Sequence, residues 1–435
     1  MLTGFLRAFR TPDLRRKLLF TLFIIAVFRL GCALPTPGIS EKAVNACIGA
    51  ASKSGNSVYQ LVNLFSGGAL FRLSVFALGI MPYITASIIL QLLAVVIPRL
   101  ETLRKEGQTG QAKITQYTRY LTVGLGVLQA TGIIALARAG QLIQGCTANL
   151  IPNPSVFTIA TMVIIMTSGT AVIMWLGELI TDKGVGNGMS IMIFTQIIAV
   201  VPGQLQLIYN NKPKYVFVLV LLMAVVIIAF VALMEQAQRR IPIQYAKRMV
   251  GRRMYGGTST YIPLKINLAG VIPVIFASSL LYIPQLVAQL FGHNAVTGWA
   301  GWVQDNLVRN SDRPAYAISF FVLIVFFTYF YVSITFPPDE VADGMKKGGG
   351  FIPGIRPGGP TAGYLSHVVS RLTAAGSLYL AVIALIPVVA IGLLNATAQF
   401  PLGGTSILIM VGVGLDTVKQ IESQLQQRNY EGFLR

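Results

Sequence analysis

Long uninterrupted apolar stretches constrain this chain more than any other feature of its sequence. About ten are present, each roughly 17–25 residues long, the length that an α-helix needs to cross a bilayer. They lie near 18–37, 73–97, 116–137, 155–177, 188–203, 215–234, 269–290, 314–336, 372–394 and 403–418. The fifth and the tenth are shorter than the others. The sequence therefore predicts an all-α polytopic membrane protein with ten transmembrane helices.

The composition agrees with a chain that lies mostly in a membrane. Of the 435 residues, 54% are hydrophobic and 11% are charged, whereas a soluble domain has about 25% charged residues. Cys32, Cys47 and Cys146 are odd in number and lack metal-ligand spacing, so no disulfide framework and no metal site are expected. The basic N-terminal segment has no signal-peptide cleavage pattern, and we expect it on the inner membrane surface.

The distribution of basic residues predicts the orientation of the chain. The net charge is +19, and cytosolic loops of membrane proteins carry an excess of lysine and arginine. If both termini are cytosolic, 25 of the 34 basic residues lie inside, 8 lie outside and Arg29 lies within the first stretch. This asymmetry favours ten spans with both ends in the cytosol.

An even number of spans can divide into two halves of five with opposite orientation, and such inverted repeats often enclose a central pathway. We therefore expect two inverted five-helix halves around a central pore. The expected parts are a cytosolic amphipathic N-terminus (1–17), an N-terminal half with spans one to five (18–203), an outer loop with span six and a basic cytosolic loop (204–268), the rest of the C-terminal half with spans seven to ten and a cytosolic loop at 337–371 (269–418), and a cytosolic tail (419–435).

No catalytic motif is present in the sequence. GxxxxGK[ST], HExxH and CxxC are absent, and GVGNG at 184–188 has neither a preceding strand nor the spacing of a nucleotide fingerprint. GVGLD at 412–416 resembles the motif of intramembrane aspartyl proteases, which need two aspartates sharing a proton. No second aspartate lies inside a span. We therefore expect no enzyme, no catalytic residue, no cofactor and no metal.

The position of the acidic residues separates two classes of transport protein. Ion-coupled transporters usually place carboxylates deep in the membrane, whereas Glu178, Asp182, Glu235 and Asp416 all lie at span ends. This argues against a coupled small-solute transporter and leaves a passive channel open. Arg29, the basic residue inside a span, can snorkel or pair with backbone carbonyls near the outer face. A secondary transporter with inverted repeats and a scaffold that only recruits ribosomes remain as alternatives.

The segment 58–93 contains a short amphipathic piece, then Ser66-Gly67-Gly68, then a full span. The short piece, about 58–66, is either an interfacial helix or a re-entrant piece in a cavity between the halves, where protein or water surrounds it. Within the following span we expect Pro82 to interrupt the helix. The polar residues Thr85, Ser87 and Gln91 either pair with neighbouring helices or weaken a seam that must open.

Two long inner segments, 235–268 and 337–371, carry the strongest concentration of positive charge. In the first, the pairs Arg239-Arg240, Lys247-Arg248 and Arg252-Arg253 exceed what topology requires, and they suit an acidic or RNA-bearing partner. In the second, KKGGGFIPGIRPGGP (346–360) combines helix-breaking prolines with turn-forming glycines. We expect a shaped docking surface that holds Arg356 away from the membrane.

Several long strings resemble one known family. LFSGGALFRLSVFALGIMPYITASIILQLL, EGQTGQAKITQYTRYLT, WLGELITDKGVGNGMSIMIF, QRRIPIQYAKRMVGRRMYGGTSTYIPLKINLAGVIPVIFASS and FIPGIRPGGPTAGYL closely resemble bacterial members of the SecY/Sec61 alpha family, the central subunits of the Sec protein-conducting channel. The resemblance covers nearly the whole chain in the right order. It implies an hourglass channel between two five-helix halves, with a pore ring, a plug and a lateral gate mainly between spans 2–3 and 7–8.

The resemblance also assigns site residues. The pore ring would be Ile80, Ile84, Met189, Ile193, Ile275 and Ile409. The plug, about 58–70, would include Val58, Leu61, Leu64, Phe65, Ser66, Gly67 and Gly68. The lateral gate would include Ser87 and Gln91, and docking would use Arg239, Arg240, Lys247, Arg248, Arg252, Arg253 and Arg356. Met189 departs from the isoleucine usual in the family, and methionine is the more flexible side chain.

The implied function is translocation of unfolded secretory polypeptides across the bacterial cytoplasmic membrane, with lateral release of transmembrane segments into lipid. The implied partners are the SecE and SecG subunits, the SecA ATPase, the ribosome, signal peptides, nascent or unfolded polypeptides and membrane lipids. Because the chain has no phosphate-binding motif, the driving energy must come from SecA or the ribosome.

Overall fold

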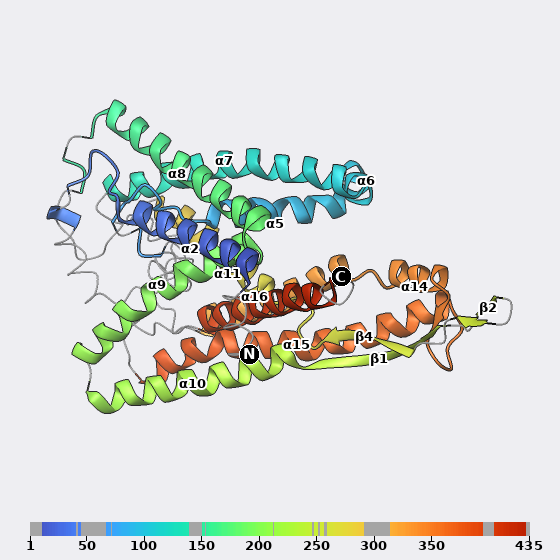
Figure 1. Ribbon diagram of the computed structural model, residues 1–435. Coiled ribbons are helices and arrows are strands. Elements are labelled where there is room, and N and C mark those ends of the chain that lie inside the picture. The colour runs from blue at the N-terminus through green and yellow to red at the C-terminus, as the bar shows by residue number, and fades with distance from the viewer. Residues whose placement is uncertain are drawn as a thin grey trace.

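The architecture is that of a computed structural model, which describes residues 11–40, 42–44, 67–70, 72–138, 150–152, 154–211, 213–245, 248–250, 253–255, 259–290, 314–394 and 404–431. Most of these residues are helical (Figure 1). The long helices are α2 (Pro12–Ala33), α5 (Met81–Val96), α7 (Gln108–Arg138), α8 (Val156–Lys183), α9 (Gly188–Asn211), α10 (Lys214–Gln236), α11 (Ile272–Leu290), α13 (Pro314–Thr335), α15 (Gly359–Leu394) and α16 (Gly404–Glu431). Two short helices, α6 (Pro98–Lys105) and α14 (Pro338–Lys347), follow α5 and α13.

Each of the ten predicted stretches overlaps one of these long helices. Among the described residues, six helices are long and apolar enough to cross a membrane, and a seventh qualifies if α5 and α6, which meet at 101°, count as one span. The chain therefore has a mostly helical, polytopic fold. The count of ten spans in two inverted halves stays a prediction.

Several predicted boundaries differ from the helices. Helix α9 continues to Asn211 through the start of the expected outer loop, and α16 continues to Glu431 through most of the expected tail. Helix α5 begins at Met81 and not near residue 73, so Pro82 lies in its first turn and does not interrupt it. Proline is tolerated there because the first N–H groups of a helix have no intrahelical partner.

Turns replace the predicted helix over residues 72–80 because the segment is tied to the residues that follow α2 and to α8. Thr36 donates its hydroxyl to the Leu73 carbonyl oxygen over 2.6 Å, and Val75 N–H donates to Leu34 O over 3.0 Å. Gly79 has φ +56°, a left-handed conformation that glycine adopts without steric cost. These contacts bring the chain to the start of α5 close against α8.

The closest approach in this region is at Gly169 of α8. A Cβ atom added there would lie 2.1 Å from the Val75 carbonyl oxygen. We expect Gly169→Ala to destabilise the protein by about 1–3 kcal/mol, because the backbone would have to move in a packed interior. Thermal unfolding in detergent measures this effect. Gly124→Ala in α7 is the matched control, since nothing lies within 4 Å of the added atom, and an equal loss in both variants would contradict the packing explanation.

The predicted basic loop at 235–268 is mainly a β-hairpin, which corrects the all-α expectation. Strand β1 (Gln238–Tyr245) pairs antiparallel with β4 (Ser259–Lys265), and β2 (Arg248–Val250) pairs with β3 (Arg253–Tyr255) toward the tip. We call residues 238–265 the basic hairpin. Its base is closed by a hydrogen bond from Ile266 N to Ala237 O over 3.1 Å.

The second inner segment joins the same sheet. Strand β5 (Gly350–Phe351) pairs antiparallel with β1, so the strand order is β4-β1-β5. A Cβ at Gly350 would lie 3.1 Å from the Tyr245 ring and 3.2 Å from Ile243 Cγ2, so glycine permits this close approach. Figure 1 shows the strands projecting from the end of the helices where α6 and α14 also lie. The two basic segments therefore form one projection.

Candidate functional site

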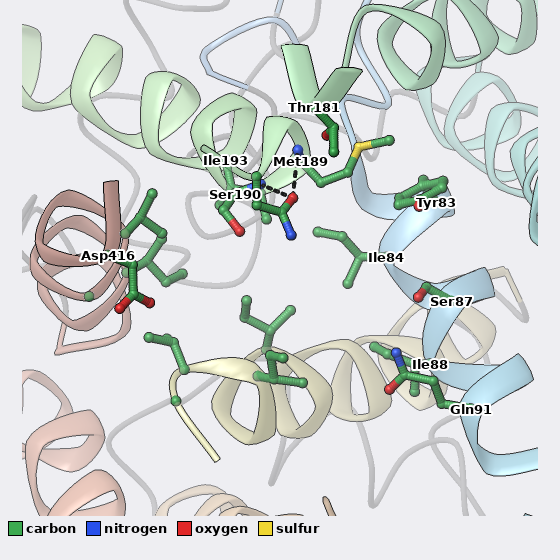
Figure 2. A pocket seen from close by; sticks show the side chains of 18 of the residues that line it. Tyr83, Ile84, Ser87, Ile88, Gln91, Thr181, Met189, Ser190, Ile193 and Asp416 are labelled. Atoms are coloured by element: carbon green, nitrogen blue, oxygen red, sulfur yellow. Dashed lines mark hydrogen bonds between the residues drawn. The ribbon is translucent and has the colours of Figure 1, made fainter. Parts of the chain in front are cut away.

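A cavity of about 610 Å³ lies where α5, α9, α11 and α16 approach one another. Five residues of the predicted ring line it: Ile84, Met189, Ile193, Ile275 and Ile409. The sixth, Ile80, is fully buried in the apolar cluster to which the other five also belong. Figure 2 shows Ile84, Met189 and Ile193 gathered on one side of the open space. Residues far apart in sequence thus meet at one apolar site.

Local structure fixes the direction of these side chains. Ile84 N–H donates to Ile80 O over 3.1 Å, so the two residues stand one helical turn apart at the start of α5. Met189 and Ile193 have the same spacing at the start of α9. Asn187 caps that helix, because its side-chain oxygen accepts hydrogen bonds from the backbone N–H groups of Met189 (3.1 Å) and Ser190 (3.4 Å).

The start of α9 is also held against α8. An added Cβ at Gly188 would lie 1.8 Å from the Gly177 carbonyl oxygen, so only glycine fits this position. The side chain of Met189 in turn packs over Gly177, where an added Cβ would lie 2.6 Å from its sulfur. Met189 therefore fills space between α8 and the cavity, which its flexible side chain suits.

The acidic residues around the cavity are mostly paired. Glu178 accepts two hydrogen bonds from Arg119, at 2.9 and 2.7 Å, which joins α8 to α7. Asn267 donates to Glu235 over 2.6 Å, and Lys265 lies 3.2 Å from Asp416. These carboxylates have structural partners, which agrees with the sequence argument against an ion-coupling site.

The two predicted gate residues also lie on the cavity. Ser87 and Gln91 stand on successive turns of α5 and line it together with Ile88 (Figure 2). Thr85 instead donates its hydroxyl to Met81 O over 2.9 Å within its own helix. Ser87 and Gln91 therefore supply polar groups beside the apolar ring residues.

Two predicted plug residues, Gly67 and Gly68, are described, and both have a positive φ, +67° and +85°. The predicted plug residues Val58, Leu61, Leu64, Phe65 and Ser66 lie outside the described residues. Arg29 donates to the Gly67 carbonyl oxygen over 2.8 Å. Of the two alternatives for Arg29, the structure therefore supports pairing with a backbone carbonyl.

The predicted docking residues divide between described and undescribed parts of the projection. Arg239 and Arg240 are exposed on β1, and the Arg240 guanidinium lies 4.8 Å from the centre of the Tyr261 ring. Arg356 is exposed in the turn between β5 and α15. The backbone of Arg248 lies in β2 and that of Arg253 in β3, whereas Lys247 and Arg252 lie outside the described residues.

The attachment of the projection to the helices around the cavity was not predicted from the sequence. Asn267 bonds Glu235 at the end of α10 and also the Gly270 carbonyl oxygen over 3.1 Å, two residues before α11 begins. An added Cβ at Gly376 of α15 would lie 2.7 Å from the Ile266 oxygen. No sequence signal predicted these contacts, because the partners of Glu235 and Gly376 come from other parts of the chain.

A bundle of apolar helices around a cavity with apolar ring residues, with a basic projection at one end, defines a class of polytopic membrane proteins. The comparisons with known proteins identify its family. The SecY family model matches residues 74–418, and the chain belongs to the SecY family.

Curated relatives match over the full length. Protein translocase subunit SecY of Streptomyces scabiei is 62% identical over 441 residues, covering 100% of both chains. The protein of the same name from Mycobacterium bovis is 58% identical over 441 residues with the same coverage.

Solved structures share the fold at low sequence identity. A structure described as a protein conducting channel has a TM-score of 0.64 at 17% identity and covers 93% of this chain and 91% of that chain. Sec61 from a canine ribosome–channel complex has a TM-score of 0.60 at 17% identity with the same coverage. At this identity the similarity concerns the fold.

Proposed function

We propose that this chain is the pore-forming subunit of a protein translocase. It conducts unfolded secretory polypeptides across the bacterial cytoplasmic membrane and releases transmembrane segments sideways into lipid. The membership of the SecY family and the full-length relatives named protein translocase subunit support this function. The observation that carries the mechanism is the convergence of the ring residues in one apolar cluster, five of them lining one cavity.

The ring suits a pathway for chains of varied sequence. Apolar side chains offer no specific hydrogen bonds, and an apolar constriction can stay dewetted and block ions while yielding around a polypeptide. A substrate segment of about 20 apolar residues gains free energy by leaving into lipid. The seam beside Ser87 and Gln91 would provide that lateral exit. None of these steps requires a catalytic residue in the channel.

The proposed topology has ten spans in two inverted halves, with both termini in the cytosol. The overlap of every predicted stretch with one long helix supports it, as does the inside excess of basic residues. The basic hairpin and Arg356 then face the cytosol and dock SecA or the ribosome. We further propose that the chain assembles with SecE, which would clamp the two halves, and with SecG.

Vesicles reconstituted with this chain and its SecE and SecG subunits test the function directly. SecA and ATP should drive uptake of a secretory precursor into a protease-protected space. Saturable flux of a small solute without SecA would instead indicate a secondary transporter. Ribosome binding without any permeation, even after the plug is removed, would indicate a scaffold.

Deletion of residues 58–66 tests the proposed plug. We expect ion leak through reconstituted vesicles to rise, because the outer side of the apolar constriction would lose its cover. Membrane conductance before and after deletion measures the effect, with a deletion of equal length in the C-terminal tail as a control. Vesicles that remain equally tight would contradict the plug assignment.

A further inference from the structure

Helix α13 ends at a carbonyl group that its own backbone cannot satisfy. Ile334 is followed by Thr335, Phe336, Pro337 and Pro338. A helical carbonyl normally accepts from the N–H four residues later, or three residues later in a tighter last turn. Both of those positions are prolines here, and proline has no N–H group.

A side chain from a distant helix supplies the missing donor. Arg104 of α6 donates from Nη2 to the Ile334 carbonyl oxygen over 3.0 Å, across 230 residues of sequence. The carbonyl end of a helix carries partial negative charge, so a guanidinium group is favoured there. The double proline thus creates an acceptor at the end of α13 that suits an arginine.

A second basic residue of α6 also indicates that this end of the helix lies near the junction of α13 and α14. Lys105 is bound to Glu101 over 2.7 Å within α6. The pKa of Lys105 is raised chiefly by this hydrogen bond to Glu101, and to a smaller extent by the charge of Glu340 in the first turn of α14. The basic end of α6 therefore faces the carbonyl end of α13 and the acidic start of α14.

The Arg104 bond crosses a boundary between two groups of helices. Helix α6 connects α5 to α7, which pack on each other, whereas α13 packs on α11 and α15. Across this boundary α11 contacts both α5 and α7. Under the proposed function the same boundary is the lateral gate.

We propose that Arg104 holds the cytosolic end of the lateral gate closed by donating to the Ile334 carbonyl oxygen, which lacks a backbone donor because of the two prolines. We call this contact the clasp. This inference rests on the proposed function. Because Arg104 is exposed, water competes for the bond and the clasp is weak enough for a docked partner to release. A partner that displaces α14 or the adjoining β5 would move the acceptor away from α6, since α14 contacts β5.

Arg104→Ala tests the clasp in vesicles reconstituted with the complete complex, SecA and ATP. The readout is uptake of a precursor whose signal segment has been weakened, relative to uptake of the normal precursor. We expect this ratio to rise by about two- to fivefold, the size expected for loss of one exposed charge-assisted bond at a helix end. Arg99→Ala is the matched control, because it removes an exposed arginine of the same helix whose side chain makes no hydrogen bond or ion pair among the described residues.

Each outcome has a distinct meaning. An unchanged ratio in Arg104→Ala, or an equal rise in Arg99→Ala, would overturn the clasp, provided that the wild-type complex transports the normal precursor. A wild-type complex without any transport would count against the proposed function instead. A general loss of structure would lower the thermal stability in detergent and the uptake of both precursors together, and would not raise the ratio. A fall of both without a higher ratio therefore also contradicts the clasp.

Discussion

Changing Arg356 to glutamate should lower SecA- and ATP-driven uptake of a secretory precursor by about tenfold or more, while the complex stays folded. Arg356 is exposed, and its side chain makes no hydrogen bond or ion pair within the part of the chain that the structure describes. Its backbone is held separately, because Thr361 donates its hydroxyl to the Arg356 carbonyl oxygen over 2.9 Å. The substitution therefore reverses a charge without removing a described internal contact.

Lys347→Glu is the matched control for this experiment. Lys347 is also exposed, lies in the same predicted inner segment (337–371) and would change the net charge equally. Direct binding of SecA should weaken in Arg356→Glu, and thermal unfolding in detergent should not change. Equal transport by Arg356→Glu and the wild type would remove the docking role of this residue. An equal defect in Lys347→Glu would show that the loss of transport is a general effect of charge and not a specific role of Arg356.

The second large effect is expected at the ring. Ile193→Asn should raise the ion conductance of vesicles that contain the resting complex on the order of tenfold, because a polar side chain favours water in a constriction that excludes ions by staying dry. Ile193 is only 7% exposed and lines the cavity. Conductance across planar bilayers measures the change directly.

Ile193→Leu keeps the volume and the apolar character of the side chain, so it should remain as tight as the wild type. Thermal unfolding of both variants in detergent separates wetting of the pore from loss of structure. If Ile193→Asn folds normally and does not conduct, this residue does not form part of the seal. If Ile193→Leu leaks equally, the shape of the side chain matters and its polarity does not.

Apolar length alone located the helices, because crossing a bilayer imposes about 20 apolar residues on any helical span. It could not locate their ends. Residues 72–80 are as apolar as the helix that follows, and their turns depend on contacts with α2 and α8 that lie elsewhere in the sequence. For the same reason apolar length could not distinguish Pro82 inside a helix from Pro82 in a first turn.

The basic hairpin carried a sequence signal that was not used. Ile241 and Ile243 are buried on alternate positions of β1 between exposed neighbours, which is the period of a half-buried strand. Strand β5 could not be found in this way, since two residues carry no period and their partners on β1 lie more than a hundred positions earlier. Pairing between such distant segments is a property of the folded chain.

The candidate ring was predictable only in part. Ile80 and Ile84, like Met189 and Ile193, are four residues apart and share a helix face, which the sequence shows. Their convergence with Ile275 and Ile409 depends on the packing of four helices, and it was expected from the family resemblance and not from spacing. The pairing of Glu235 with Asn267 had no sequence signal, because either residue could have faced water.

Under the proposed topology, the length of helix α15 sets where a cytosolic partner can touch the channel. Its 36 residues extend about 54 Å at 1.5 Å per residue, whereas the hydrocarbon core of a bilayer is about 30 Å thick. Between about a quarter and almost half of the helix must therefore stand clear of the lipid tails, for tilts of about 40° down to zero. Arg356 lies just before the first residue of this helix, so under the proposed topology a bulky motor or ribosome would reach it without pushing into the headgroups.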